Sequence, residues 1–255
     1  MPLPERAHGT PAFERTWTVR LGDTDVGDRL RLDAVARYLQ DIAFDQLDAS
    51  DDGHLHGAWI VRRTVIDVLR PIVFRENVTL QRWSSALSNR WCNMRVRIEG
   101  DRGGLIETEA FLIHIDPTTG RPSRMTDRFM APMLEHTTEH RLRWKAHLHP
   151  FDDAAETRST AFATRSTDFD RLGHVNNAIY WQPVEDALAE DPAFVAKPHR
   201  AIVEHVGAVL QGDDVRVRSH RDGDTLHLQI DTATASSALV RVESLVSEMS
   251  SGQGA

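Results

Sequence analysis

The feature that most constrains the fold is an internal repeat. Thr24-Asp25 recurs as Thr167-Asp168 after 143 positions, and Tyr38-Leu39-Gln40 recurs as Tyr180-Trp181-Gln182 after 142 positions. The order of the features between and after these pairs is the same in both parts of the chain. Because similarity at a fixed spacing is the mark of a repeated structural unit, the 255 residues are expected to fold as two similar halves.

Each half predicts one helix among several strands. A short strand leads into an aspartate-containing loop, a helical stretch follows, and about four strand-like segments separated by turn residues come next. In the first half the apolar spacing from Leu32 to Leu47 is helical, with Asp33 placed to cap the N-terminus. In the second half the helix is shorter, and Pro183 must kink it or end its first segment. We therefore expect an α+β fold, with an antiparallel sheet wrapped around one helix in each half.

The repeat also sets the expected division of the chain. Residues 10–130 form an N-terminal unit, residues 156–247 form a C-terminal unit, and residues 131–155 connect them. The longest apolar runs, such as AFLIHI, are far shorter than the about 20 residues that span a bilayer, and MPLPERAHGT lacks the apolar core of a signal peptide. The expectation is a cytoplasmic protein with no membrane partner.

Charge and cysteine content exclude other classes of protein. The net charge is −8, from 30 Lys and Arg against 38 Asp and Glu, so the basic face that nucleic-acid binding requires is not expected. Many arginines fall between residues 62 and 143, which fits either a solvated strand face or a docking surface for an acidic partner. The single cysteine, Cys92, excludes an internal disulfide and is expected in the core.

Common catalytic motifs are absent from the sequence. It contains neither a G-x-S-x-G elbow nor a Gly-rich phosphate loop, which argues against a serine α/β-hydrolase and a nucleotide-dependent enzyme. The connector contains His136-Thr-Thr-Glu139-His140, which matches the H-x-x-E-H metalloprotease pattern, but no additional carboxylate ligand is evident. No metal site is therefore expected.

The segment Asp168–Trp181, DFDRLGHVNNAIYW, concentrates residues suited to acyl chemistry. Asn176 or Asn177 can cap a helix, and Gly173 permits a turn at the helix entrance. The free N–H groups and positive dipole end of a helix N-terminus can polarise a carbonyl. A carboxylate such as Asp170 can activate water or attack that carbonyl. The spacing alone is compatible both with capping and with catalysis.

This segment resembles the hotdog-fold thioesterases, in which G-H-V-N-N-A-x-Y follows an aspartate. Two such units in one chain resemble the fatty acyl-ACP thioesterases of plants and bacteria. Segments of the first half are similar to that family's N-terminal unit, namely GAWIVRRTVIDVLRPIVFRENVTLQRW, Arg90-Trp91 and AFLIHIDPTTGRPSRM. The resemblance covers roughly Phe13 to Val246 and implies a tandem (double) hotdog fold.

The resemblance implies an enzyme of fatty acid metabolism that hydrolyses fatty acyl-ACP to the free acid and acyl carrier protein. It places the acyl-chain pocket mainly in the N-terminal unit and catalysis in the C-terminal unit, with no metal or organic cofactor. Asp170 is the expected general base or nucleophile, while His174 and Asn176 position the thioester or water. The expected substrate-binding backbone amides lie between Gly173 and Asn177. The first half lacks the His-Asn-Asn set, which agrees with one catalytic and one binding half.

Two departures from the family pattern keep alternatives open. Leu172 stands where the family has a catalytic asparagine, and Val209-Leu210-Gln211 stands where plant members have a Glu-Cys pair. Glu204 lies too far upstream to replace that glutamate. An acyl-CoA thioesterase and a hotdog protein that binds acyl groups without hydrolysis are the alternatives. Both a monomer and a homodimer are compatible with the sequence, because two units in one chain already supply the pairing of single hotdog proteins.

Overall fold

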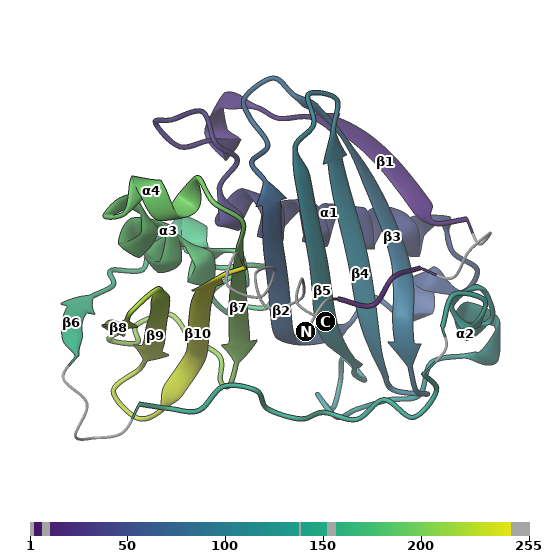
Figure 1. Ribbon diagram of the computed structural model, residues 1–255. Helices are drawn as coiled ribbons and strands as arrows, with labels where there is room; N and C mark the ends of the chain where they lie inside the picture. Colours follow the sequence, from purple (N-terminus) through teal and green to yellow (C-terminus); the bar gives the residue numbers. More distant parts are fainter. Residues whose placement is uncertain (1–2, 7–10, 138, 152–156, 246–255) are drawn as a thin grey trace, which may run out of the picture.

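The computed structural model describes residues 3–6, 11–137, 139–151 and 157–245, and its strands form one antiparallel sheet (Figure 1). The first unit supplies β1 (Phe13–Thr18), β2 (Trp59–Arg70), β3 (Asn77–Leu87), β4 (Trp91–Gly100) and β5 (Leu105–His114). The second supplies β6 (Arg158–Ala161), β7 (His199–His205), β8 (Arg216–Asp222), β9 (Thr225–Asp231) and β10 (Ser236–Ser244). The strand order is β1-β3-β4-β5-β2-β7-β10-β9-β8-β6. Equivalent strands of the two units therefore lie at the same distance from the two edges of the sheet, as a repeat requires.

The two units meet where β2 pairs with β7. Arg63 lies opposite Glu204 in this antiparallel ladder, and its Nη1 donates to Glu204 Oε1 at 3.1 Å. Four residues along, Arg200 donates two hydrogen bonds of 2.6 Å to the carboxylate of Asp67 across the same pair of strands. Backbone pairing and ion pairs therefore join the halves into one sheet.

The helices cover one face of this sheet. α1 (Leu32–Ala49) crosses the strands of the first unit, and α3 (Gln182–Ala189) and α4 (Pro192–Val195) lie beside those of the second (Figure 1). Short 3₁₀ turns flank the helices. η1 (Leu21–Asp23) precedes α1, η2 (Gly53–Leu55) lies between α1 and β2, and η3 (Ser166–Asp168) and η4 (Ile179–Trp181) precede α3. Each unit therefore has the predicted arrangement of an antiparallel sheet with one main helix.

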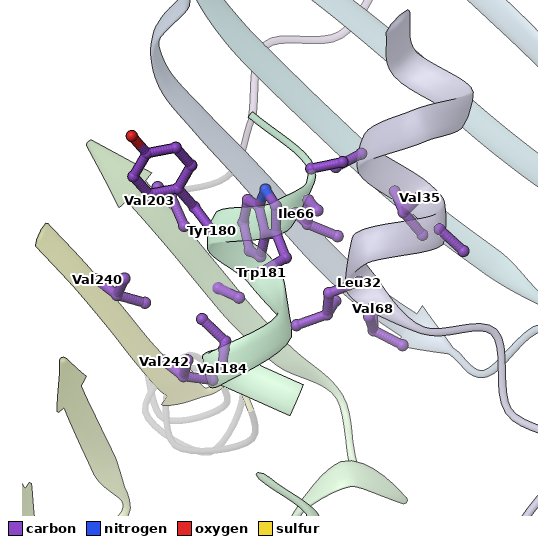
Figure 2. Packing of buried hydrophobic residues seen from close by; sticks show 14 of the residues in the cluster. Leu32, Val35, Ile66, Val68, Tyr180, Trp181, Val184, Val203, Val240 and Val242 are labelled. Carbon is purple, nitrogen blue, oxygen red and sulfur yellow. The ribbon is translucent and has the colours of Figure 1, made fainter. Parts of the chain in front are cut away.

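One apolar core runs through both units. Trp181 is 1% exposed and belongs to the same cluster as Leu32 of α1, Ile66 of β2 and Val203 of β7 (Figure 2). Burying a large apolar side chain is worth roughly 1.5–3 kcal/mol. Because residues from both halves share this core, the relative position of the two units is fixed by packing.

The start of α1 differs from the expectation. Asp33 does not cap the helix, since its carboxylate accepts hydrogen bonds of 2.8 Å from Arg31 Nε and from Arg37 Nη1. The N–H of Leu32 instead donates to Glu185 Oε1 of the other unit at 2.5 Å. The acceptor comes from 153 residues further along the chain, so local sequence could not identify it.

Pro183 follows the second of its two predicted alternatives. The 3₁₀ turn η4 ends at Trp181, and α3 begins immediately after it with Pro183 in the first turn. A proline is tolerated there because the N–H groups of the first turn have no partner within the helix.

The structure adds a helix that the sequence reading missed. α2 (Asp127–Leu134) begins at Thr126, whose hydroxyl accepts from Phe129 N–H at 3.2 Å. α2 crosses the expected start of the connector at residue 131. Residue 10, residues 152–156 and residues 246–247, where other expected boundaries fall, lie outside the described residues.

Some of the arginines of the first half form ion pairs on the sheet. Arg95 and Arg97 both pair with Glu107 on the neighbouring strand β5, at 2.6 and 3.0 Å. For Arg95 and Arg97, the paired strand face is therefore a better explanation than a docking surface. Cys92 is a buried free thiol, as expected for a core residue. No helix among the described residues is long and apolar enough to cross a membrane.

Candidate active site

The segment around Asp170 forms a tight turn that ends at a helix start. Asp170 N–H donates to His174 O at 2.9 Å, and Gly173 N–H donates to Asp170 O at 3.0 Å. Gly173 has a φ of 74°, a conformation that favours glycine. The side chain of Asp170 joins the turn, because its Oδ1 accepts from Leu172 N–H at 2.8 Å. The acid is thus held at a fixed position without an ion pair to a described residue.

The second oxygen of Asp170 remains available for chemistry. Among the described residues no hydrogen-bond donor reaches Oδ2, and the side chain is half-buried. The hydroxyl of Tyr180 lies within electrostatic range of this carboxylate. Burial, above all, raises the pKa of Tyr180 to about 12, and the negative charges of Asp170 and Asp213 act in the same direction. Tyr180 is therefore a neutral neighbour of the acid at physiological pH.

Asn176 is fixed by both units. Its Oδ1 accepts from Ala178 N–H at 2.9 Å, which caps the first turn of the helical segment. The same oxygen accepts from Gln40 Nε2 at 2.9 Å, and Asn176 Nδ2 donates back to Gln40 Oε1 at 3.0 Å. Gln40 lies on α1 of the N-terminal unit, so the predicted site contains a residue from the other half.

His174 and Asn177 present groups without a described partner. The ring of His174 is exposed and makes no hydrogen bond with a described residue, while its backbone bridges to Leu210. The N–H of Asn177 likewise meets no acceptor in the described part of the chain. This N–H lies in the turn from Asn176 to Ala178 that leads directly into η4, and this turn is the helix start of the Asp170 loop. A free N–H at such a place can donate to an oxygen of a bound molecule.

A second loop with the same backbone geometry lies in the N-terminal unit. Asp25 N–H donates to Arg29 O at 2.9 Å, and Gly27 N–H donates to Asp25 Oδ1 at 2.9 Å. These bonds match those of the Asp170 loop at an offset of 145 positions. Asp28, with a φ of 64°, takes the place of Gly173. The offsets of 143 and 142 read from residue identities are therefore wrong by two or three positions at this loop.

This second loop, from Asp25 to Arg29, is called the twin loop, and its side chains bind different partners from those of the Asp170 loop. Arg29, in the place of His174, pairs with Asp25 at 3.0 Å and with Glu185 of α3. Glu185 also accepts the N–H of Leu32, which is the equivalent of Asn177. Burial acts against the charge of Arg29, yet the carboxylates of Glu185 and Asp25 raise its pKa above the usual value. The acid of this loop is consequently neutralised, and its helix start is occupied.

The Asp170 loop also contacts α1 through Arg171. Its guanidinium lies 5.5 Å from the ring centre of Phe44, and Nη2 donates to Gly57 O at 3.4 Å. Phe44 is 47% exposed and Leu172 is 63% exposed, so apolar surface adjoins the acid.

The residues at the two departures from the family pattern differ in their contacts and burial. The backbone of Leu172 binds Asp170, while its side chain faces solvent. Val209 is buried next to the loop, because its carbonyl accepts from Val175 N–H at 3.0 Å. β7 ends at His205, before Val209.

Glu204 serves the connector. Its carboxylate accepts from the N–H groups of His147 at 2.9 Å and Leu148 at 3.2 Å, in addition to Arg63. It is therefore committed to the joint between the units, in agreement with its exclusion as a substitute for the plant glutamate. The described residues contain no group of three or more His, Cys, Asp or Glu placed to hold a metal ion.

Comparison with known families identifies the chain. Residues 10–133 match the N-terminal domain of acyl-ACP thioesterases, and residues 151–244 match the C-terminal domain. The chain belongs to the acyl-ACP thioesterase family. This confirms the resemblance found in the sequence, and family membership supports thioesterase activity.

Relatives of the family agree with this assignment. An uncharacterized protein of Mycobacterium tuberculosis (strain H37Rv) is 39% identical over 242 residues, covering 94% of this chain and 95% of the relative. The 12:0-ACP thioesterase from Umbellularia californica has a TM-score of 0.71 at 18% identity, covering 91% of this chain and 96% of that one. The acyl-ACP thioesterase from Bacteroides thetaiotaomicron also has a TM-score of 0.71, at 14% identity, covering 90% and 96%. These likenesses confirm the tandem hotdog fold.

Three neighbours of the site were not assigned to it from the sequence. Gln40 was noted as part of the repeat, and Arg171 and Tyr180 lie within or beside the motif, but none carries a local signal of its contacts. The role of Gln40 is indicated by its equivalence to Glu185 at an offset of 145 positions. This equivalence is found only when the two loops are aligned by their hydrogen bonds.

Proposed function

We propose that this protein hydrolyses fatty acyl thioesters of acyl carrier protein, with Asp170 as general base or nucleophile. The observation that carries the proposal is the pairing of a carboxylate that has an unbonded oxygen with a helix start whose N–H is unoccupied. A thioester carbonyl needs both, since one group activates the attacking oxygen and the other stabilises the charge on the carbonyl oxygen.

In the general-base route, Asp170 takes a proton from water as the water oxygen bonds to the carbonyl carbon. The carbon–sulfur bond then breaks, the fatty acid is released, and the thiolate receives the proton from Asp170. In the nucleophile route, an oxygen of Asp170 bonds to the carbonyl carbon, the carbon–sulfur bond breaks, and the thiolate leaves. Water then hydrolyses the resulting mixed anhydride, which releases the fatty acid, regenerates the Asp170 carboxylate and supplies the proton that the thiolate takes up. In both routes His174 and Asn176 position the thioester or water.

The twin loop indicates where the carbonyl oxygen binds. In the N-terminal unit a carboxylate oxygen of Glu185 lies 2.5 Å from the N–H of Leu32. By the offset of 145 positions, the N–H of Asn177 is its equivalent. We infer that an oxyanion occupies this place in the Asp170 loop. Gly173 serves the same function indirectly, because its turn brings the acid and the amide together.

We propose that the acyl chain enters the N-terminal unit along α1. Gln40, Phe44 and Leu47 lie on one face of this helix, at the i, i+4 and i+7 positions. Gln40 touches Asn176, Phe44 touches Arg171, and Leu47 packs against a buried cluster. The cluster is rich in methionine, whose flexible side chains adapt to a guest, and consists of Leu87, Cys92, Met94, Met125, Phe129, Met130 and Met133.

A second candidate route is less suitable for a hydrocarbon. A surface groove of about 640 Å³ runs between β1 and α1 and adjoins Phe44. Three carboxylates line it, from Asp23, Asp41 and Asp45, and an apolar chain there would displace water from charged groups without replacing it. We therefore propose the Leu47 side, with binding in the N-terminal unit and catalysis in the C-terminal unit.

The experiment that tests this function is a hydrolysis screen with acyl-ACP and acyl-CoA of several chain lengths. Release of thiol from acyl-ACP by the wild type, lost in Asp170→Asn, is the expected result. Faster turnover of acyl-CoA would make CoA thioesters the substrate, and bound lipid without thiol release from any substrate would indicate an acyl-binding protein. Chromatography at the assay concentration shows whether the active species is a monomer or a homodimer.

A further inference from the structure

The two main helices carry equivalent residues that each reach into the loop of the other unit. Gln40 of α1 and Glu185 of α3 are 145 positions apart, the same offset that relates the two loops. Gln40 exchanges two hydrogen bonds with Asn176, whereas Glu185 binds the N–H of Leu32 and the guanidinium of Arg29. Each helix therefore supplies one side chain that hydrogen-bonds to the helix start of the other half.

The chemical difference between these two side chains is small, but its consequence is large. A carboxylate only accepts hydrogen bonds, so Glu185 takes the backbone N–H of the helix start and a cation. A primary amide donates and accepts, so Gln40 pairs with the amide of Asn176 in both directions. The N–H of Asn177 then stays without an acceptor among the described residues.

We propose that Gln40 is a positioning residue of the thioesterase site, whose neutral amide fixes Asn176 and leaves the Asn177 N–H open to the thioester oxygen. This inference rests on the proposed function. Gln40 of the N-terminal unit thus leaves the backbone N–H at the helix start of the C-terminal loop free for substrate. The carboxylate of Glu185, by contrast, binds the equivalent N–H of the N-terminal loop.

Electrostatics give the reason for an amide at this position. A carboxylate at residue 40 would be attracted by the positive end of the helical segment and by its free N–H. It would also find a donor in Asn176 Nδ2, as Glu185 finds one in Arg29. The substrate oxygen would then compete with an internal oxyanion already bound in its place.

The test compares two substitutions of Gln40, with the acyl-ACP that the wild type hydrolyses fastest. Gln40→Ala removes two hydrogen bonds, and we expect kcat to fall about tenfold. Gln40→Glu is nearly isosteric and adds the internal oxyanion, and we expect kcat at pH 7 to fall at least about a hundredfold. Ala49→Glu places the same charge at the far end of α1 and should leave kcat within about twofold.

A pH profile separates internal inhibition from a structural effect. The ratio of kcat for Gln40→Glu to kcat for Gln40→Ala should rise as pH falls toward the ordinary glutamate pKa of about 4.3, because the protonated group no longer competes. The charged and ionisable groups near position 40 are the same in both variants, so their effects cancel in the ratio; they are Asp41 of α1 and Asp170, Arg171 and His174 of the loop. Thermal melting over the same pH range excludes unfolding.

The results distinguish this inference from the function on which it rests. A flat ratio, or a Gln40→Glu enzyme at least as active as Gln40→Ala, overturns the role of Gln40 while Asp170→Asn remains inactive. Full activity of Asp170→Asn would instead overturn the assignment of the site itself.

Discussion

The loops at Asp25 and Asp170 have the same backbone and different chemistry. Both hold an aspartate with the N–H two residues later, both turn at a residue of positive φ, and both end at a helix start. In the first loop Arg29 pairs with the acid Asp25, and Glu185 binds the N–H at the helix start. In the second loop Asp170 Oδ2 and the N–H of Asn177 have no partner among the described residues. A repeated fold therefore supplies the template twice, and the side chains decide which copy can act on a substrate.

We expect the largest difference between the loops when the N–H of Asn177 is removed. Asn177→Pro deletes this donor at a position where a helix tolerates proline, and loss of one oxyanion donor costs about 10²–10³-fold in kcat. Asn177→Ala keeps the N–H and is the matched control, for which we expect a change of less than about fivefold. Steady-state kinetics of both variants measure the effect, and equal activities would show that this amide does not bind the oxyanion.

The unequal contacts of Glu185 and Gln40 predict unequal effects on stability. Glu185→Ala leaves Arg29 short of a partner and the helix start uncapped, so the free energy of unfolding should fall by about 3–5 kcal/mol. Gln40→Ala removes hydrogen bonds between neutral groups and should cost about 1–2 kcal/mol. Urea denaturation of the two variants gives both values. A larger loss for Gln40→Ala would mean that the internal ion pair does not hold the first loop closed.

We expect the smallest effects on stability and activity from a change at Leu172. Its side chain is 63% exposed, and Asp170 uses its backbone N–H alone. Leu172→Ala should therefore change stability by at most about 0.5 kcal/mol and kcat/KM by less than about twofold. Leu172→Asn, which restores the family residue, is the informative companion. A large gain in kcat for Leu172→Asn alone would show that this chain lacks a catalytic group that its relatives possess.

The sequence predicted the architecture well because its signals can be seen in residue identities and spacing. The apolar spacing of α1 and the turn residues between strands come from residues that are near each other, and the repeat shows as matching residues about 143 positions apart. α2 was missed although Thr126 and Phe129 form an N-terminal cap, because Pro132 lies inside the helix and a proline usually ends one.

The contacts between units could not be predicted in the same way. Asp33 is a reasonable cap by position, yet Glu185 takes the N–H of Leu32 from the other half. The identical pairs Thr24-Asp25 and Thr167-Asp168 aligned the halves two positions out of register, which concealed the equivalence of Asp25 with Asp170 and of Gln40 with Glu185. Hydrogen-bond geometry corrected the alignment, since it compares backbones instead of residue names.

The most direct test of the central claim is kcat/KM on acyl-ACP for Asp170→Asn beside Asp25→Asn. The two changes remove one charge from equivalent turns, so they match in chemistry and differ in the loop that they alter. We expect Asp170→Asn to lose at least about 10²-fold and Asp25→Asn to keep activity within about threefold after correction for the folded fraction. Equal losses in both variants, or a greater loss for Asp25→Asn, would contradict catalysis by the Asp170 loop.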